Sequence, residues 1–130
     1  LQPRAVIESV WVDHNVSENN QTGMRIHVKF TINNLKDSTG QVSAYFYMAS
    51  GEKVQAKNGY YTTPDGQVAV GSNFVPSYDN ALFNDFSFFL PYDALQFGSG
   101  SYDLKFHVSI YTPEYRLALS DYKTFTLTVR

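Results

Sequence analysis

Two stretches of the chain alternate between apolar and polar residues, and this period of two restricts the fold more than any other feature. The apolar positions are Met24, Ile26, Val28 and Phe30 in the first stretch and Leu104, Phe106, Val108 and Ile110 in the second. Successive side chains of a strand point to opposite faces of its sheet. Each stretch therefore predicts a strand with one buried face, whose intervening polar residues are more exposed.

Shorter stretches of similar character predict further strands at residues 5–12, 42–48, 67–71, 82–90 and 125–129. Turn-forming residues separate them, including Pro64-Asp65-Gly66 and Gly98-Ser99-Gly100. Residues 13–23 are rich in Asn and Ser, and we interpret them as a long loop. Residues 53–61 are ambiguous and are compatible with an edge strand. Residues 91–95 follow a strand and suit a single helical turn.

Seven or eight strands joined by turns predict an all-β fold, a sandwich of two antiparallel sheets. The 130 residues correspond to one domain, residues 1–130, which we expect to be part of a longer protein. Tyr102 follows the Gly98–Gly100 turn, where a tyrosine anchors the corner of an immunoglobulin-like sandwich. The alternative for Tyr102 is that it is simply a core aromatic residue. The alternative for the fold is a sheet that closes into a barrel.

Composition excludes several classes of partner and chemistry. The net charge is -2, whereas nucleic-acid binding usually requires a basic surplus. No apolar run approaches the roughly 20 residues of a membrane-spanning helix. The absence of cysteine excludes disulfides and thiolate chemistry but leaves the compartment open, and we favour a bacterial cell envelope over the cytoplasm.

No group of residues forms a recognisable catalytic or metal-binding motif, so we predict neither enzyme activity nor a cofactor. A Gly-x-Ser-x-Gly nucleophile elbow is absent. His27 and His107 would form a metal-binding pair only if their strands were neighbours, and we interpret both as solvated strand residues. Asp79, Asn80 and Asp85 fit either a loose calcium site or, as we prefer, an Asn- and Asp-rich turn.

Tyrosine is more abundant than one core requires. Seven tyrosines are not all needed for one core: Tyr45, Tyr47, Tyr60, Tyr61, Tyr78, Tyr111 and Tyr115. Tyr45 and Tyr47 alternate with Phe46 and Met48, so they should point to an outer sheet face. Tyr111 lies at a polar position of its own strand. Because tyrosine is favoured at interfaces, we predict that Tyr45, Tyr47 and Tyr111 form a binding surface. The alternative is that tyrosine is simply a good strand residue.

Three stretches together resemble an uncharacterised β-sandwich accessory domain that recurs in multi-domain proteins of anaerobic gut bacteria. They are residues 10–15 (VWVDHN), 23–30 (GMRIHVKF) and 65–71 (DGQVAVG). The resemblance implies a non-catalytic module and supplies no catalytic residues. We expect an interaction domain that binds a protein surface, in its own polypeptide or on a partner. The alternative is a carbohydrate-binding module with an exposed tyrosine platform.

Removing divalent cations should leave the thermal stability unchanged, because the sequence offers no closed set of metal ligands. Thermal unfolding followed by circular dichroism, with and without EDTA, tests this. A rise of several degrees in Tm on adding calcium would contradict the prediction, and Asp79 and Asp85 would then be the first residues to substitute.

Overall fold

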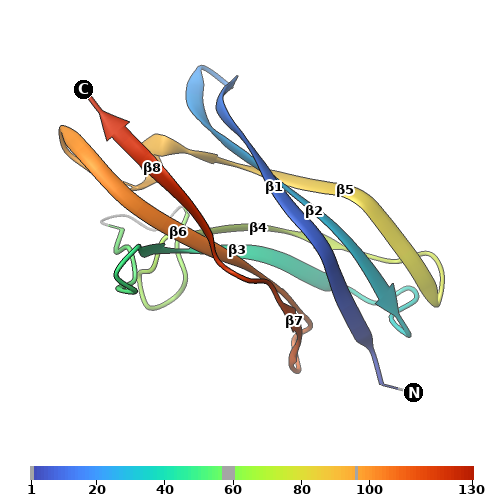
Figure 1. Cartoon of the computed structure of the whole chain (residues 1–130). Coiled ribbons are helices and arrows are strands. Elements are labelled where there is room, and N and C mark those ends of the chain that lie inside the picture. The colour runs from blue at the N-terminus through green and yellow to red at the C-terminus, as the bar shows by residue number, and fades with distance from the viewer. Residues whose placement is uncertain (1, 57–60, 96) are drawn as a thin grey trace.

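The computed structural model describes residues 2–56, 61–95 and 97–130 (Figure 1). The described chain contains eight strands and one short 3-10 helix. They are β1 (Arg4–Glu18), β2 (Gln21–Asn33), β3 (Gly40–Met48), β4 (Ala69–Phe74), β5 (Asn80–Pro91), η1 (Tyr92–Leu95), β6 (Gly100–Tyr111), β7 (Arg116–Leu119) and β8 (Lys123–Val129). No helix in the described part of the chain is long and apolar enough to cross a membrane.

The strands form two antiparallel sheets. Sheet A has the order β1-β2-β5, and sheet B has the order β4-β3-β6, with β7 and β8 both paired to β6. The sheets lie one above the other in Figure 1, and the described strands include no pair that joins them. The predicted all-β sandwich is therefore confirmed, and the closed barrel is excluded.

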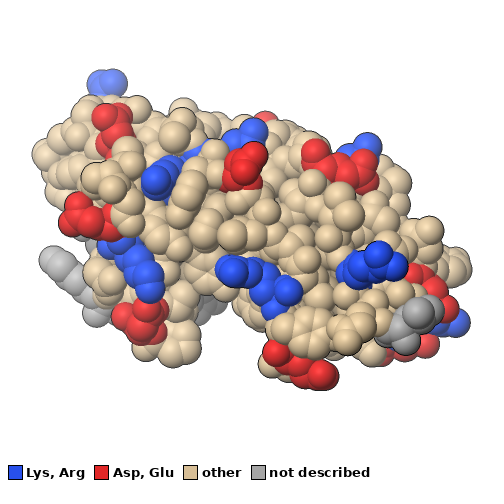
Figure 2. All heavy atoms as spheres, turned by 60° about the horizontal axis from the view of Figure 1, so that its bottom comes forward, with Lys and Arg blue, Asp and Glu red and all other residues tan. Residues whose placement is uncertain are grey.

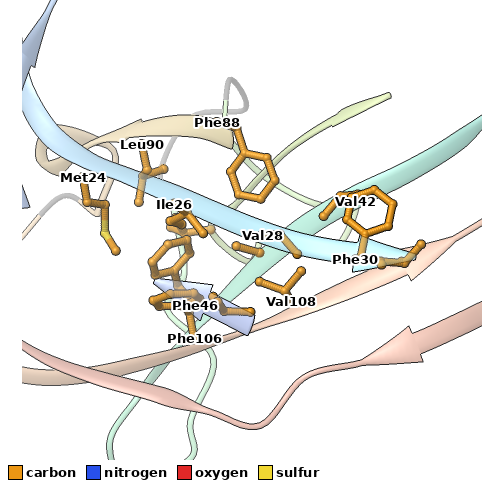
Figure 3. Packing of buried hydrophobic residues seen from close by; sticks show 14 of the residues in the cluster. Met24, Ile26, Val28, Phe30, Val42, Phe46, Phe88, Leu90, Phe106 and Val108 are labelled. Atoms are coloured by element: carbon orange, nitrogen blue, oxygen red, sulfur yellow. The ribbon is translucent and has the colours of Figure 1, made fainter. Parts of the chain in front are cut away.

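The core lies between the inward faces of the two sheets (Figure 3). The eight apolar residues predicted from the alternation are each at most 1% exposed. Phe74 of β4 reaches across from sheet B and packs against Phe30 and Phe83 of sheet A, with its ring centroid 5.2 and 5.3 Å from theirs. Such edge-to-face contacts add to the stabilisation that burial provides.

The interpretation of residues 13–23 as a long loop is wrong. β1 continues to Glu18, and Glu18 pairs with Gln21, so only Asn19 and Asn20 form the turn. Both have positive φ, at 52° and 64°. A two-residue hairpin turn of this type requires φ above zero at both positions, and asparagine tolerates that conformation. The asparagines therefore mark a tight hairpin.

Other differences are local. The strand predicted at 67–71 lies at β4, a few residues later, and β7 was not predicted at all. Of residues 53–61, Lys53 and Gln55 form isolated bridges, while 57–60 lie outside the described residues. The predicted helical turn at 91–95 is confirmed as η1.

Tyr102 anchors the turn that precedes β6, which is the first of the two alternatives considered for this residue. Its hydroxyl donates a hydrogen bond to the carbonyl oxygen of Gly98 over 3.1 Å. The ring stacks on Phe97, with 4.3 Å between the ring centroids. One side chain thus fixes the turn both by a hydrogen bond and by packing.

Replacing Phe106 with alanine should lower the free energy of unfolding by about 3–5 kcal/mol, because it leaves a cavity between the sheets. Urea titration measures this loss. The control is Tyr78→Ala, since Tyr78 is 71% exposed, and its effect should stay within about 0.5 kcal/mol. A loss below about 1 kcal/mol for Phe106→Ala would contradict the assignment of this face to the core.

Candidate functional site

The structure places all three predicted binding residues on the outer face of sheet B. Tyr45 and Tyr47 come from β3 and Tyr111 from β6. The register sets Tyr45 directly opposite His107. Tyr122, which precedes β8, packs against the same group. We call the set of Tyr45, Tyr47, His107, Tyr111 and Tyr122 the tyrosine face.

His107 lies at the centre of this face, and three tyrosine rings pack around it. Tyr122 stacks on the His107 ring with 4.8 Å between centroids and 14° between planes. Tyr47 and Tyr45 meet it edge to face, at 5.1 and 6.0 Å. The Tyr47 hydroxyl is also within hydrogen-bond distance of His107 Nε2, at 3.3 Å. The rings therefore hold one another in place, and Tyr45 and Tyr47 are half-buried.

The other half of the tyrosine face covers two buried serines. The Ser43 and Tyr111 hydroxyls share a hydrogen bond of 3.0 Å. Ser43 and Ser109 are paired across β3 and β6, and each is only 4% exposed. Gly71 of β4 pairs with Ser43 on its other side. This row is closely packed, because a side chain at Gly71 would collide with the Ser43 hydroxyl.

Two hollows open on either side of Tyr45 and Tyr111, which line both. The larger, of about 800 Å³, extends over Ser43 and Gly71 toward Phe89 of β5. The smaller, of about 420 Å³, extends toward the connection between β6 and β7, where Tyr115 also lines it. The larger hollow therefore extends from the outer face of sheet B to sheet A, where Arg25 and Phe89 line it, and Tyr45 and Tyr111 lie between the two hollows.

The tyrosine face itself contains no Asp, Glu, Lys or Arg, but Lys105 and Arg116 lie beside it and Glu114 lines the smaller hollow. Burial lowers the pKa of His107, and the positive charges of Arg116 and Lys105 lower it further, so the ring is neutral at pH 7. The Lys105 ammonium lies 4.2 Å from the centroid of the Tyr122 ring, a cation–π contact. On the side of the molecule shown in Figure 2, acidic and basic side chains are interspersed, without a patch of a single sign.

The remaining predicted residues are dispersed. Tyr61 lines the larger hollow, and Tyr78 lies in the loop before β5. Tyr60 is outside the described residues. Sequence analysis missed His107 and Tyr122. His107 had been assigned to solvent, and Tyr122 lies outside every predicted strand. The position of His107 opposite Tyr45 follows from strand register, which the alternation alone does not give.

The outer face of sheet A holds a different cluster, centred on His27. The interpretation of His27 as a solvated residue is wrong, because it is only 8% exposed. Its Nδ1 lies 2.6 Å from a carboxylate oxygen of Asp85, and its Nε2 lies 2.9 Å from one of Asp13. The Trp11 indole stacks on the ring at 5.1 Å. One imidazole thus links all three strands of sheet A.

The local geometry of β5 explains how Asp85 reaches His27. The register shifts between Val28 and Phe30, where Phe86 pairs with Val28 and Phe83 with Phe30. Two residues of β5, Asn84 and Asp85, therefore lie opposite one residue of β2. Bulges of this kind redirect side chains, and this one keeps both phenylalanines inward while Asp85 reaches the outer face.

The structure does not bring His27 and His107 together. They lie in different sheets, β2 pairing with β1 and β5 while β6 pairs with β3, β7 and β8. Asp85 is hydrogen-bonded to His27, and the described residues show no hydrogen bond from it to Asp79 or Asn80, the other two residues of the possible calcium site. The described residues contain no group of three His, Cys, Asp or Glu side chains that could hold a metal ion.

Comparison of the chain with known protein families, curated proteins and solved structures finds no match. The tyrosine face offers a rigid apolar area and hydroxyl groups, with two hollows beside them. That combination suits recognition of another molecular surface.

Raising the pH above 10 should destabilise the protein through Tyr45. Burial, followed by the hydrogen bond with Tyr111, raises the pKa of Tyr45 from 10.0 to about 12. The unfolded chain therefore ionises first, so the stabilising contribution is complete below pH 10 and is lost as the pH rises to about 12. Urea titrations across this range should show a smaller loss of stability for Tyr45→Phe. The control Tyr78→Phe should behave as the wild type, and an equal loss in all three proteins would contradict the burial of this phenol.

Proposed function

We propose that this protein is a non-catalytic interaction domain whose tyrosine face binds a protein surface, either in its own polypeptide or on a partner. The observation that carries the proposal is the aromatic group of Tyr45 and Tyr111 with a hollow on each side. Aromatic residues and arginine are both enriched at protein interfaces, and Arg25 and Arg116 line these hollows beside the tyrosines.

The rigidity of the face supports this function. Packing around His107 fixes Tyr45, Tyr47 and Tyr122 before a ligand arrives. Ordering a side chain on binding costs conformational entropy, so a surface that is already ordered loses less on association. The partly buried hydrogen bond between Ser43 and Tyr111 holds the fourth ring in the same way.

The same packing favours a protein ligand over a carbohydrate. A sugar ring stacks on an aromatic ring whose face is open. One face of Tyr122 lies against His107, and the Lys105 ammonium lies over the ring as well. Tyr45 and Tyr47 are half-buried, and their rings are nearly perpendicular to that of His107. Tyr122 therefore offers no open face to a sugar, and binding to a glycan array is the outcome that would favour the carbohydrate alternative.

The setting that we propose is an accessory module of a larger, bacterial envelope protein, with an immunoglobulin-like sandwich. The strand order supports the immunoglobulin-like sandwich, since a three-stranded sheet faces a sheet in which β3 and β6 are the central strands. The Tyr102 hydrogen bond at the corner before β6 supports it too.

Substituting Tyr45 and Tyr47 together with serine should weaken association with the flanking domains of the polypeptide by at least about tenfold, because central interface tyrosines often contribute 2 kcal/mol or more. Isothermal titration calorimetry measures the change. Tyr122→Ser, at a residue that is 46% exposed, tests the same face with less disturbance of the fold.

The matched control is Tyr78→Ser, an exposed tyrosine outside the tyrosine face, which should bind as the wild type does. Unchanged affinity in the Tyr122 and Tyr45/Tyr47 variants would contradict the proposal. Unfolding of the double variant would show that these two tyrosines belong to the core, and the proposal would then fail for them.

A further inference from the structure

The last strand, β8, has one edge without a strand partner. It pairs with β6 through all seven of its residues, in an unbroken register from Phe106↔Lys123 to Gly100↔Val129. The described residues make no backbone hydrogen bond to its other edge, which we call the β8 edge. A hollow of about 520 Å³, lined by His14 and Asn15 of β1 and by Phe125 and Thr126, lies beside β8.

The other edge strands carry features that hinder pairing with another chain. β1 has two register shifts, and β5 has one and ends at Pro91. β4 has only six residues, and the N–H of Ala69 is already bonded to the Tyr61 carbonyl. Bulges, proline and short length are the usual protection of exposed sheet edges.

β8 has no register shift and no proline, and it is one residue longer than β4. Between Lys123 and Arg130 its sequence is Thr-Phe-Thr-Leu-Thr-Val, without charge, proline or glycine. A short, uncharged segment of β-branched and aromatic residues readily pairs with another strand when its edge is open. The alternation also divides it cleanly, with the threonines exposed and Phe125, Leu127 and Val129 facing inward.

We propose that the β8 edge is a homodimer interface, in which β8 pairs antiparallel with β8 of a second copy about a twofold axis at Thr126. The strand is complementary to itself in this register. Thr124 lies opposite Thr128 of the second copy, Phe125 opposite Leu127, and Lys123 opposite Val129. No like charges face each other, and outward residues meet outward residues, so each sheet B continues into the next.

The dimer would also extend the tyrosine face. Tyr122 immediately precedes β8, and Arg130 of the second copy lies opposite it in this register. The outer faces of the two sheets B then form one surface that presents two tyrosine faces. The homodimer does not depend on the proposed ligand, because it is measured with the protein alone.

The test is the oligomeric state of the wild type, Thr126→Lys and Thr31→Lys, measured by sedimentation velocity over a wide concentration range. Thr126→Lys places two like charges opposite each other and should raise the dimer dissociation constant at least about tenfold. Thr31→Lys is the matched control. Thr31, like Thr126, lies on an outer face. Its hydroxyl donates to the Glu8 carboxylate over 3.0 Å, as that of Thr126 donates to Asp103 over 2.9 Å. Unlike β8, however, β2 is paired on both sides.

The proposal predicts a dimer for the wild type and Thr31→Lys and a monomer for Thr126→Lys with an unchanged circular dichroism spectrum. Amide hydrogen exchange in residues 124–129 should also speed up on dilution of the wild type. A wild type that remains monomeric overturns the proposal, and so do equal association constants in the two variants. If Thr126→Lys does not fold, the double variant Thr124→Lys/Thr128→Lys makes the same test.

Discussion

The apolar contact between the inward faces of the two sheets is the constraint on which the rest of the molecule depends. Side chains alternate along each strand, so burying Ala44 and Phe46 obliges Tyr45 and Tyr47 to point outward. Burying Ile110 does the same for Tyr111. A slip of one residue in β3 or β6 would exchange core and surface together. The core thereby fixes the composition of both outer faces.

The two outer faces use different interactions. On sheet A, hydrogen bonds between His27 and two carboxylates link three strands. On sheet B, ring packing around a neutral His107 joins β3, β6 and the segment that leads into β8. On sheet A, both ring nitrogens of His27 are already hydrogen-bonded to residues of the protein itself. The arrangement on sheet B leaves two hollows beside half-buried rings, and it is therefore the better candidate for binding.

The sequence predicted what depends on local alternation. The two-sheet architecture, the eight core residues and the outward direction of Tyr45, Tyr47 and Tyr111 all follow from a period of two. What it did not predict depends on contacts distant in sequence. The surroundings of His27 require the bulge in β5 that brings Asp85 to β2, and the place of His107 requires the register between β3 and β6. The loop predicted at residues 13–23 was wrong for another reason. Asn19 and Asn20 have positive φ and form a tight hairpin turn, which we interpreted as part of a loop.

We propose that the outer face of sheet B, rather than that of sheet A, contacts another protein surface. Amide hydrogen exchange, compared between the isolated domain and the domain within its intact polypeptide, distinguishes the two faces. In the intact polypeptide, exchange should be slower in β3, β6 and the connection at residues 112–115, with little change in β1. Slower exchange confined to β1 and β2 around Trp11 and His27, with none in sheet B, would contradict it.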